Sequence, residues 1–205
     1  MWKQIITRIA DFRIAATRIM TIFIMLLAIF STHSFSQNGV IDIVFETSGL
    51  FLLTICSVGR LWALLYIGGY KRRELITEGP YSITRNPLYL FSLIGAIGIG
   101  LASENLLVLS ALVIFYIAYY PITILAEEKK MTETFGQTYL DYMRRTPRFL
   151  PRFSLYKRDD QNKINADVFL KNLANGMWFI WIFIALHLIE MLQQGGYIPV
   201  FLKVP

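Results

Sequence analysis

Long apolar runs separated by short polar segments dominate this sequence of 205 residues. A membrane-spanning helix needs about 20 predominantly apolar residues, because the hydrocarbon core of a bilayer is about 30 Å thick. Only 17% of the residues are charged, whereas a soluble domain carries about a quarter. We therefore predict an all-α, multi-pass transmembrane bundle with about five spans, the third and fifth of them short: Ile14–Phe30, Ile43–Ile67, Leu88–Ala102, Leu106–Ala126 and Met177–Leu192.

The positions of the cations support this number of spans and predict an orientation. With five spans, 18 of the 20 Lys and Arg residues fall on one side, Lys203 falls on the other, and Arg60 lies within a span. The positive-inside rule then places the N-terminus and the long polar segments in the cytoplasm, under an inner or plasma membrane if the cell is bacterial. Cations beside apolar spans contact anionic lipids, so we expect membrane lipids and no nucleic acid as partners. For Arg60 we favour snorkelling or an internal partner over substrate binding.

Few residues of this chain are suited to binding metals or forming disulfides. The sequence has one cysteine, Cys56, and two histidines, His33 and His187. One cysteine excludes an internal disulfide, and this set makes a zinc site improbable. No motif indicates a carboxylate-bound metal, so we predict no metal site.

The chain divides into three parts. Residues 1–70 form N-terminal anchor helices that begin with a helix on the inner membrane surface over residues 2–18 and end at Gly68-Gly69. The first 36 residues also resemble a signal peptide, but we expect a retained anchor. Residues 71–152 form the core, and residues 153–205 form a linker and a last transmembrane helix. The oligomeric state stays open.

A polar segment between two apolar runs, Leu75–Tyr89, carries the strongest local signals. Gly79-Pro80 predicts a turn, and Pro87 suits the first turn of a helix. The free backbone N–H groups at such a helix start bind anions, and Arg85 lies just ahead of it. Each feature alone also suits any loop that re-enters a membrane helix.

The second cytoplasmic piece follows the fourth apolar run. Glu127 and Glu128 continue that helix out of the membrane, Gly136 ends it, and Pro147 and Pro151 close the segment. A carboxylate can accept hydrogen bonds from hydroxyl groups or pair with a cation. Tyrosine faces suit planar rings and cations. Taken alone, the two glutamates also fit a solvated helix face.

These pieces, in this order and spacing, resemble the isoprenylcysteine carboxyl methyltransferase family, which is related to the membrane phospholipid N-methyltransferases. The resemblance covers about residues 75–151. It rests on Gly79-Pro80-Tyr81-x-x-x-Arg85-Asn86-Pro87-x-Tyr89, a helical hairpin, Glu127-Glu128, Phe135-Gly136-x-x-Tyr139-x-x-Tyr142, and the closing Pro147 and Pro151.

The resemblance implies an integral membrane methyltransferase that binds S-adenosylmethionine in a cytoplasmic pocket between the two pieces. It implies that the residues that bind the cofactor are Leu75, Ile76, Tyr81, Asn86, Pro87, Leu88, Tyr89 and Glu127. From the residues themselves we add Glu128 to the cofactor site and predict catalytic roles for Arg85 and Glu127. Asn86 departs from the histidine of the eukaryotic enzymes, and Thr123 stands where a substrate-binding arginine would lie.

The nature of the acceptor stays open among several alternatives. Methyl transfer from a sulfonium is an in-line displacement that needs alignment and exclusion of water. A carboxylate or thiolate acceptor needs no general base, which suits motifs without histidine, and we favour it on a lipophilic molecule. The alternatives are a phospholipid amine N-methyltransferase, a nicotinamide-dependent membrane reductase, and a non-catalytic membrane protein.

Overall fold

The computed structural model describes residues 13–33, 39–67, 74–158 and 166–204. Most of the predicted surface helix over residues 2–18 lies outside the described residues, and Gly68-Gly69 lies wholly outside them. The secondary structure is almost entirely helical, as predicted: α2 (Arg13–Phe30), α3 (Val40–Ile67), α4 (Pro80–Ile83), α5 (Pro87–Ala102), α6 (Leu106–Phe135), α7 (Gln137–Arg145), the 3-10 turn η1 (Phe153–Leu155) and α8 (Ala166–Gln194).

All five predicted apolar runs are helical, and they differ in length. Three helices among the described residues are long and apolar enough to cross a membrane, namely Val40–Ile67, Leu106–Phe135 and Met177–Gln194. The apolar parts of α2 and α5, Ala15–Phe30 and Pro87–Ala102, are shorter. The fifth run, predicted to be short, is part of a helix of 29 residues.

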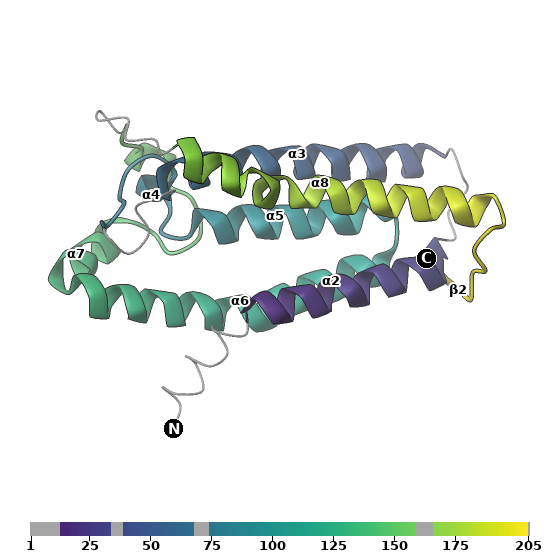
Figure 1. Cartoon of the computed structure of the whole chain (residues 1–205), viewed down its shortest axis with the longest axis horizontal. Helices are drawn as coiled ribbons and strands as arrows, with labels where there is room; N and C mark the ends of the chain where they lie inside the picture. The colour runs from purple at the N-terminus through teal and green to yellow at the C-terminus, as the bar shows by residue number, and fades with distance from the viewer. Residues whose placement is uncertain (1–12, 34–38, 68–73, 159–165, 205) are drawn as a thin grey trace, which may run out of the picture.

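The long helices form one bundle (Figure 1). Helix α3 packs along α5 and α8, while α2 packs on α6 and α8. The buried core joins four helices through Ala28, Leu53, Ile99, Ala102, Ile182 and Leu186. Helices α3 and α5 approach closely at Gly49, where a Cβ atom would lie 2.5 Å from the backbone nitrogen of Ala102. Small residues let membrane helices approach closely.

The two ends of the bundle differ in what they contain. At one end, α4, α7 and the start of α5 lie together (Figure 1). At the other end, the strands β1 (Ser31–His33) and β2 (Leu202–Val204) form a two-stranded parallel sheet, with Ser31 paired with Leu202. Three-residue strands are too short to show a period-2 pattern, so the sequence does not predict them. Among the described residues they are the one departure from an all-α fold.

Candidate functional site

The segment between α3 and α5 folds around a glycine with a positive φ. Gly79 has φ +56°, and a Cβ atom there would lie 2.3 Å from the Tyr66 ring, so glycine meets both requirements at this turn. Pro80 follows at the first position of α4, and Thr84 ends α4 with an extended backbone. Pro87 then begins α5, as predicted.

The two polar pieces of the sequence pair with each other through their backbones. Arg85 N donates to Pro147 O at 2.9 Å, and Arg152 N donates to Ile83 O at 2.9 Å. The Thr84 hydroxyl donates to Phe149 O at 3.1 Å. Segments more than 60 residues apart in the chain therefore form one continuous unit at this end of the bundle.

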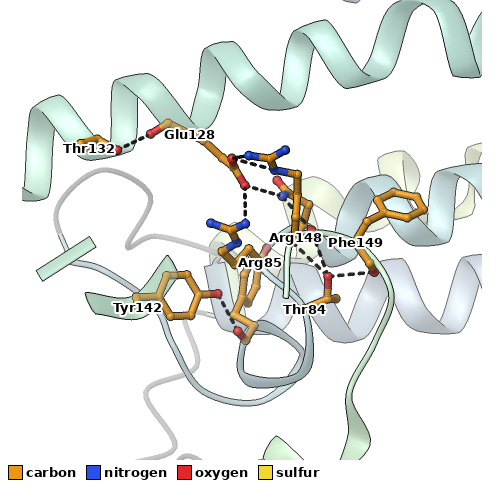
Figure 2. A network of polar contacts seen from close by, with 9 residues as sticks. Thr84, Arg85, Glu128, Thr132, Tyr142, Arg148 and Phe149 are labelled. Atoms are coloured by element: carbon orange, nitrogen blue, oxygen red, sulfur yellow. Dashed lines mark hydrogen bonds and ion pairs between the residues drawn. The ribbon is translucent and has the colours of Figure 1, made fainter. Parts of the chain in front are cut away.

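An ionic cluster lies where these pieces meet α6 (Figure 2). Glu128 Oε1 lies 3.5 Å from Arg85 Nη2, and Glu128 Oε2 lies 3.0 Å from Arg148 Nη2. Asn86 Nδ2 donates to Glu128 Oε1 at 3.4 Å and to Arg148 O at 3.0 Å. We call Arg85, Asn86, Glu128 and Arg148 the Glu128 cluster. The side chains of Glu128 and Arg85 are only 5% and 8% exposed, so this carboxylate is held by two cations in a largely dry setting.

Arg148 is the residue of this cluster that the sequence reasoning missed. It stands among the many cations of the long polar segment, and no spacing rule separates it from Arg144 or Arg145. The signal is chemical: a buried carboxylate needs charged or hydrogen-bonding partners, so a buried Glu128 requires cations from another segment. Asn86 is also explained by this requirement, because its side chain contacts Glu128 instead of capping α5.

Tyr81 lies near two further predicted site residues, Glu127 and Tyr89. Burial raises the pKa of Tyr81, and the nearby Tyr142, Glu127 and Tyr89 raise it further. Glu127 therefore lies within electrostatic reach of the Tyr81 hydroxyl, although it is not a member of the Glu128 cluster. The Tyr142 hydroxyl donates to Tyr81 O at 2.6 Å, which fixes the backbone of this turn (Figure 2).

Three buried polar atoms of this region have no hydrogen-bond partner. They are the Tyr81 hydroxyl and the Nε and Nη1 atoms of Arg85. Buried polar groups in folded proteins are nearly always paired, and each unpaired group carries a desolvation cost. Two of these atoms are donors of a guanidinium, and they suit an anionic oxygen of a bound molecule.

The other predicted site residues take simpler positions. Leu75 and Ile76 are half-buried ahead of the turn, Pro87 is buried, and Leu88 is half-buried. Thr123 is fully buried, and its hydroxyl donates to Tyr119 O one turn earlier in α6. No contact in the structure tests the binding roles of these residues.

An aromatic wall continues from the site into the bundle. The Tyr116 hydroxyl donates to Tyr89 O at 2.5 Å. The Tyr120 ring meets the Tyr89 ring edge-on, with centroids 5.5 Å apart, and stacks on Tyr116 at 4.3 Å. Tyr116 and Tyr120 also line a cavity between α2, α5, α6 and α8. The start of α5 therefore lies between the polar site and the apolar cavity.

Within the described ranges, no group of three or more His, Cys, Asp and Glu side chains is placed to hold a metal ion.

Known proteins resemble this chain over most of its length. The phospholipid methyltransferase family matches residues 40–138. The nickel-cobalt-cadmium resistance protein NccN of Alcaligenes xylosoxydans xylosoxydans is 34% identical over 182 residues, which cover 89% of this chain and 85% of that protein. The cobalt-zinc-cadmium resistance protein CzcN of Cupriavidus metallidurans is 32% identical over 184 residues, covering 90% and 84%. No solved structure matches the chain.

Proposed function

This chain belongs to the phospholipid methyltransferase family of membrane proteins, and from that premise we propose that it transfers a methyl group from S-adenosylmethionine to a lipophilic or membrane-resident acceptor. The observation that carries the proposal is the pairing of residues 83–85 with residues 147–152 beside Glu128. This pairing closes the polar end of the bundle and leaves donors of Arg85 and Tyr81 without partners.

The residues at this end fit the parts of S-adenosylmethionine. Arg85 Nε and Nη1 are buried cationic donors that match the α-carboxylate. Glu127 offers a carboxylate for the ribose hydroxyls or the ammonium group, and Tyr81 and Tyr89 offer aromatic faces for the adenine or the sulfonium. The bound cofactor would supply an electrophilic methyl group on its sulfonium.

The protein's own task is then alignment and exclusion of water. Glu128, which also pairs with Arg148, holds Arg85 in place, and the Glu128 side chain is only 5% exposed, so the guanidinium is fixed before any ligand binds. The described site residues include no histidine, and a carboxylate or thiolate acceptor needs no general base. We therefore favour a carboxyl or thiol acceptor over a phospholipid amine, which requires loss of a proton.

The orientation in the membrane is part of the proposal. We place the polar end with α4 and α7 in the cytoplasm, because most cations of the chain lie on that side. The N-terminus then lies in the cytoplasm, and in a bacterium the membrane is the inner membrane. The acceptor is lipophilic and enters from the bilayer, and anionic lipids contact the flanking cations.

The relatives suggest the setting in which the reaction acts. Both are named as metal resistance proteins. We propose that this chain likewise contributes to resistance against divalent transition metals, by methylating a membrane or lipophilic molecule. A deletion strain that is complemented by wild type and not by Glu127→Gln would link resistance to the site.

Binding of radiolabelled S-adenosylmethionine to the full-length protein in lipid nanodiscs tests the proposal. We expect saturable binding that S-adenosylhomocysteine displaces. Arg85→Gln and Tyr89→Ala should each weaken binding at least tenfold, whereas Arg144→Gln should leave it unchanged, because Arg144 is exposed on α7. Transfer of label to extracted lipids then identifies the acceptor class.

Absence of saturable binding by wild type would refute a methyltransferase. Saturable binding with nicotinamide cofactors instead would support a reductase. Equal affinities of wild type, Arg85→Gln and Tyr89→Ala would leave the enzyme proposal standing and refute this site.

A further inference from the structure

A cavity lies inside the bundle between α2, α5, α6 and α8. Its volume is about 80 Å³, and its walls are almost wholly apolar. Helices α2 and α8 supply Met20, Ile24, Met25, Trp178, Phe179 and Ile182 to the lining. Both helices lie outside the residues that match the family, so about half of this wall lies outside the matched part of the chain.

The cavity reaches the proposed cofactor site through its aromatic wall. Tyr116 and Tyr120 line the cavity, and both also contact Tyr89. Thr17 Oγ1 lies 3.4 Å from the Tyr120 hydroxyl, which adds a polar contact to the same wall. A molecule in this cavity would therefore have one end beside Tyr89.

A buried cation, Arg60, contacts two other residues that line the cavity. Arg60 belongs to α3, a helix long and apolar enough to cross a membrane. Its Nη1 donates to Ser92 Oγ at 2.6 Å, and its guanidinium carbon lies 5.5 Å from the centre of the Phe179 ring. Ser92 and Phe179 both line the cavity, so the guanidinium is one layer of side chains away from it. Arg60 also interacts electrostatically with Tyr81 and Tyr120.

An arginine at this position indicates the charge of the head group that a molecule bound in the cavity carries. Ionisable residues within membrane spans are costly, face the bundle interior and mark functional sites. A guanidinium stays charged under physiological conditions and binds carboxylate or phosphate oxygens in a bidentate manner. The lining is almost wholly apolar and the space is small, which suits one hydrocarbon chain better than the two of a phospholipid.

We propose that this cavity binds a single-chain amphiphile whose apolar tail lies between the four helices and whose anionic head group is bound by Arg60. Movement of the Phe179 side chain is part of the proposal, because its ring lies between the guanidinium and the cavity. The inference rests on the proposed function, in which this amphiphile is the methyl acceptor. It makes Arg60 the residue that selects an anionic head group.

A series of C16 amphiphiles tests the head-group preference on wild-type protein in zwitterionic nanodiscs without S-adenosylmethionine. The probes are palmitate, hexadecyl phosphate, hexadecanol and hexadecyltrimethylammonium. We expect palmitate and hexadecyl phosphate to bind saturably and at least tenfold more tightly than the neutral and cationic probes. Palmitate ahead of hexadecyl phosphate would assign a carboxylate head, and the reverse order would assign a phosphate head.

Two pairs of variants connect this preference to Arg60 and to the cavity. Arg60→Met should reduce the preference for palmitate over hexadecanol to less than threefold, while Arg60→Lys should keep part of it. Thr21→Trp should abolish binding of both probes, because Thr21 lines the cavity. Ile22→Trp is the matched control, because Ile22 is 61% exposed on the outside of α2.

Equal binding of palmitate and hexadecanol by wild type would overturn the proposal, and this result needs no folded variant. An unchanged preference in Arg60→Met, or equal effects of Thr21→Trp and Ile22→Trp, would also overturn it. Amphiphile binding is measured without cofactor, so its failure is distinct from failure of S-adenosylmethionine binding.

Discussion

The two ends of this bundle satisfy their buried polar groups in different ways. At the cytoplasmic end that we propose, the Glu128 cluster uses full charges, and the nearby Tyr81 hydroxyl and two Arg85 nitrogens have no partner. At the other end, neutral amides are used beside a buried carboxyl, that of Glu104, which hydrogen-bonds the Asp42 side chain. Gln193 Nε2 donates to Ala28 O and Ile29 O at 2.9 Å each, and Asn105 Nδ2 donates to Ser31 Oγ at 2.7 Å.

The amide contacts at that other end act as a clamp. Gln193 ties α8 to the last turn of α2, where backbone carbonyls lack helical partners. Asn105 Oδ1 accepts from Leu107 N at 3.0 Å and Val108 N at 3.3 Å, which caps the start of α6. These amides bond to backbone groups and to the Ser31 hydroxyl, whereas the Tyr81 hydroxyl and two Arg85 nitrogens at the charged end have no partner. We infer that the end with the amides is structural and that the charged end binds the ligand.

The largest expected effect comes from removing the carboxylate of the Glu128 cluster. Glu128→Leu leaves the buried guanidinium of Arg85 without its anion, and losing one partner of a buried ion pair costs about 3–5 kcal/mol. We expect the free energy of unfolding to fall by about 3 kcal/mol or more. Affinity for S-adenosylmethionine should also fall at least tenfold. Chemical denaturation in detergent and radioligand binding measure the two effects.

Glu133→Leu is the matched control on the same helix. Glu133 pairs with Lys129 at 3.6 Å, and its side chain is 65% exposed. Exposed pairs contribute about 0–1 kcal/mol, so this variant should stay near wild type. Equal losses of stability in the two variants would show that the Glu128 cluster has no special role.

The second expected effect is a loss of stability at high pH at the charged end. Burial, with Glu128 nearby, raises the pKa of Tyr139 from its ordinary value of 10 to about 12. The folded state therefore favours the neutral phenol. The contribution is fully present below pH 10 and is lost as the pH rises through 12. A rise of this size corresponds to about 3 kcal/mol.

Unfolding of wild type and Tyr139→Phe, followed from pH 9 to pH 12, measures this contribution. The fall in stability should be shallower in Tyr139→Phe, since phenylalanine does not titrate. Parallel profiles for the two proteins would exclude Tyr139 as a source of the pH dependence.

The third expected effect tests whether the two ends of the bundle have different roles. Gln193→Leu removes two hydrogen bonds to the carbonyls of α2, and we expect about 1–2 kcal/mol of lost stability. Affinity for S-adenosylmethionine should stay within twofold of wild type, because the clamp lies at the end without the Glu128 cluster. Calorimetry with and without ligand measures both quantities. A tenfold loss of affinity would refute the division of roles between the ends.

The sequence predicts the end with the Glu128 cluster better than the end with Gln193. Apolar runs give the helices because their length and composition are local properties, and ordered motifs give the family, which the match to residues 40–138 confirms. Arg148 was not predicted as a partner of Glu128, since that contact depends on how α7 and the following segment fold back. Gln193 was missed for the same reason, because the residues it joins lie more than 160 positions apart.

The smallest expected effect tests whether Tyr142 acts on stability or on binding. Tyr142→Phe removes one hydrogen bond of 2.6 Å to Tyr81 O and should lower the free energy of unfolding by about 1 kcal/mol. Because that bond fixes the turn that carries Tyr81, affinity for S-adenosylmethionine should fall about threefold to tenfold. Tyr156→Phe is the matched control, since Tyr156 is 50% exposed. If Tyr142→Phe loses stability with unchanged affinity, the turn that carries Tyr81 contributes to stability and not to ligand binding. The binding site would then not include Tyr81.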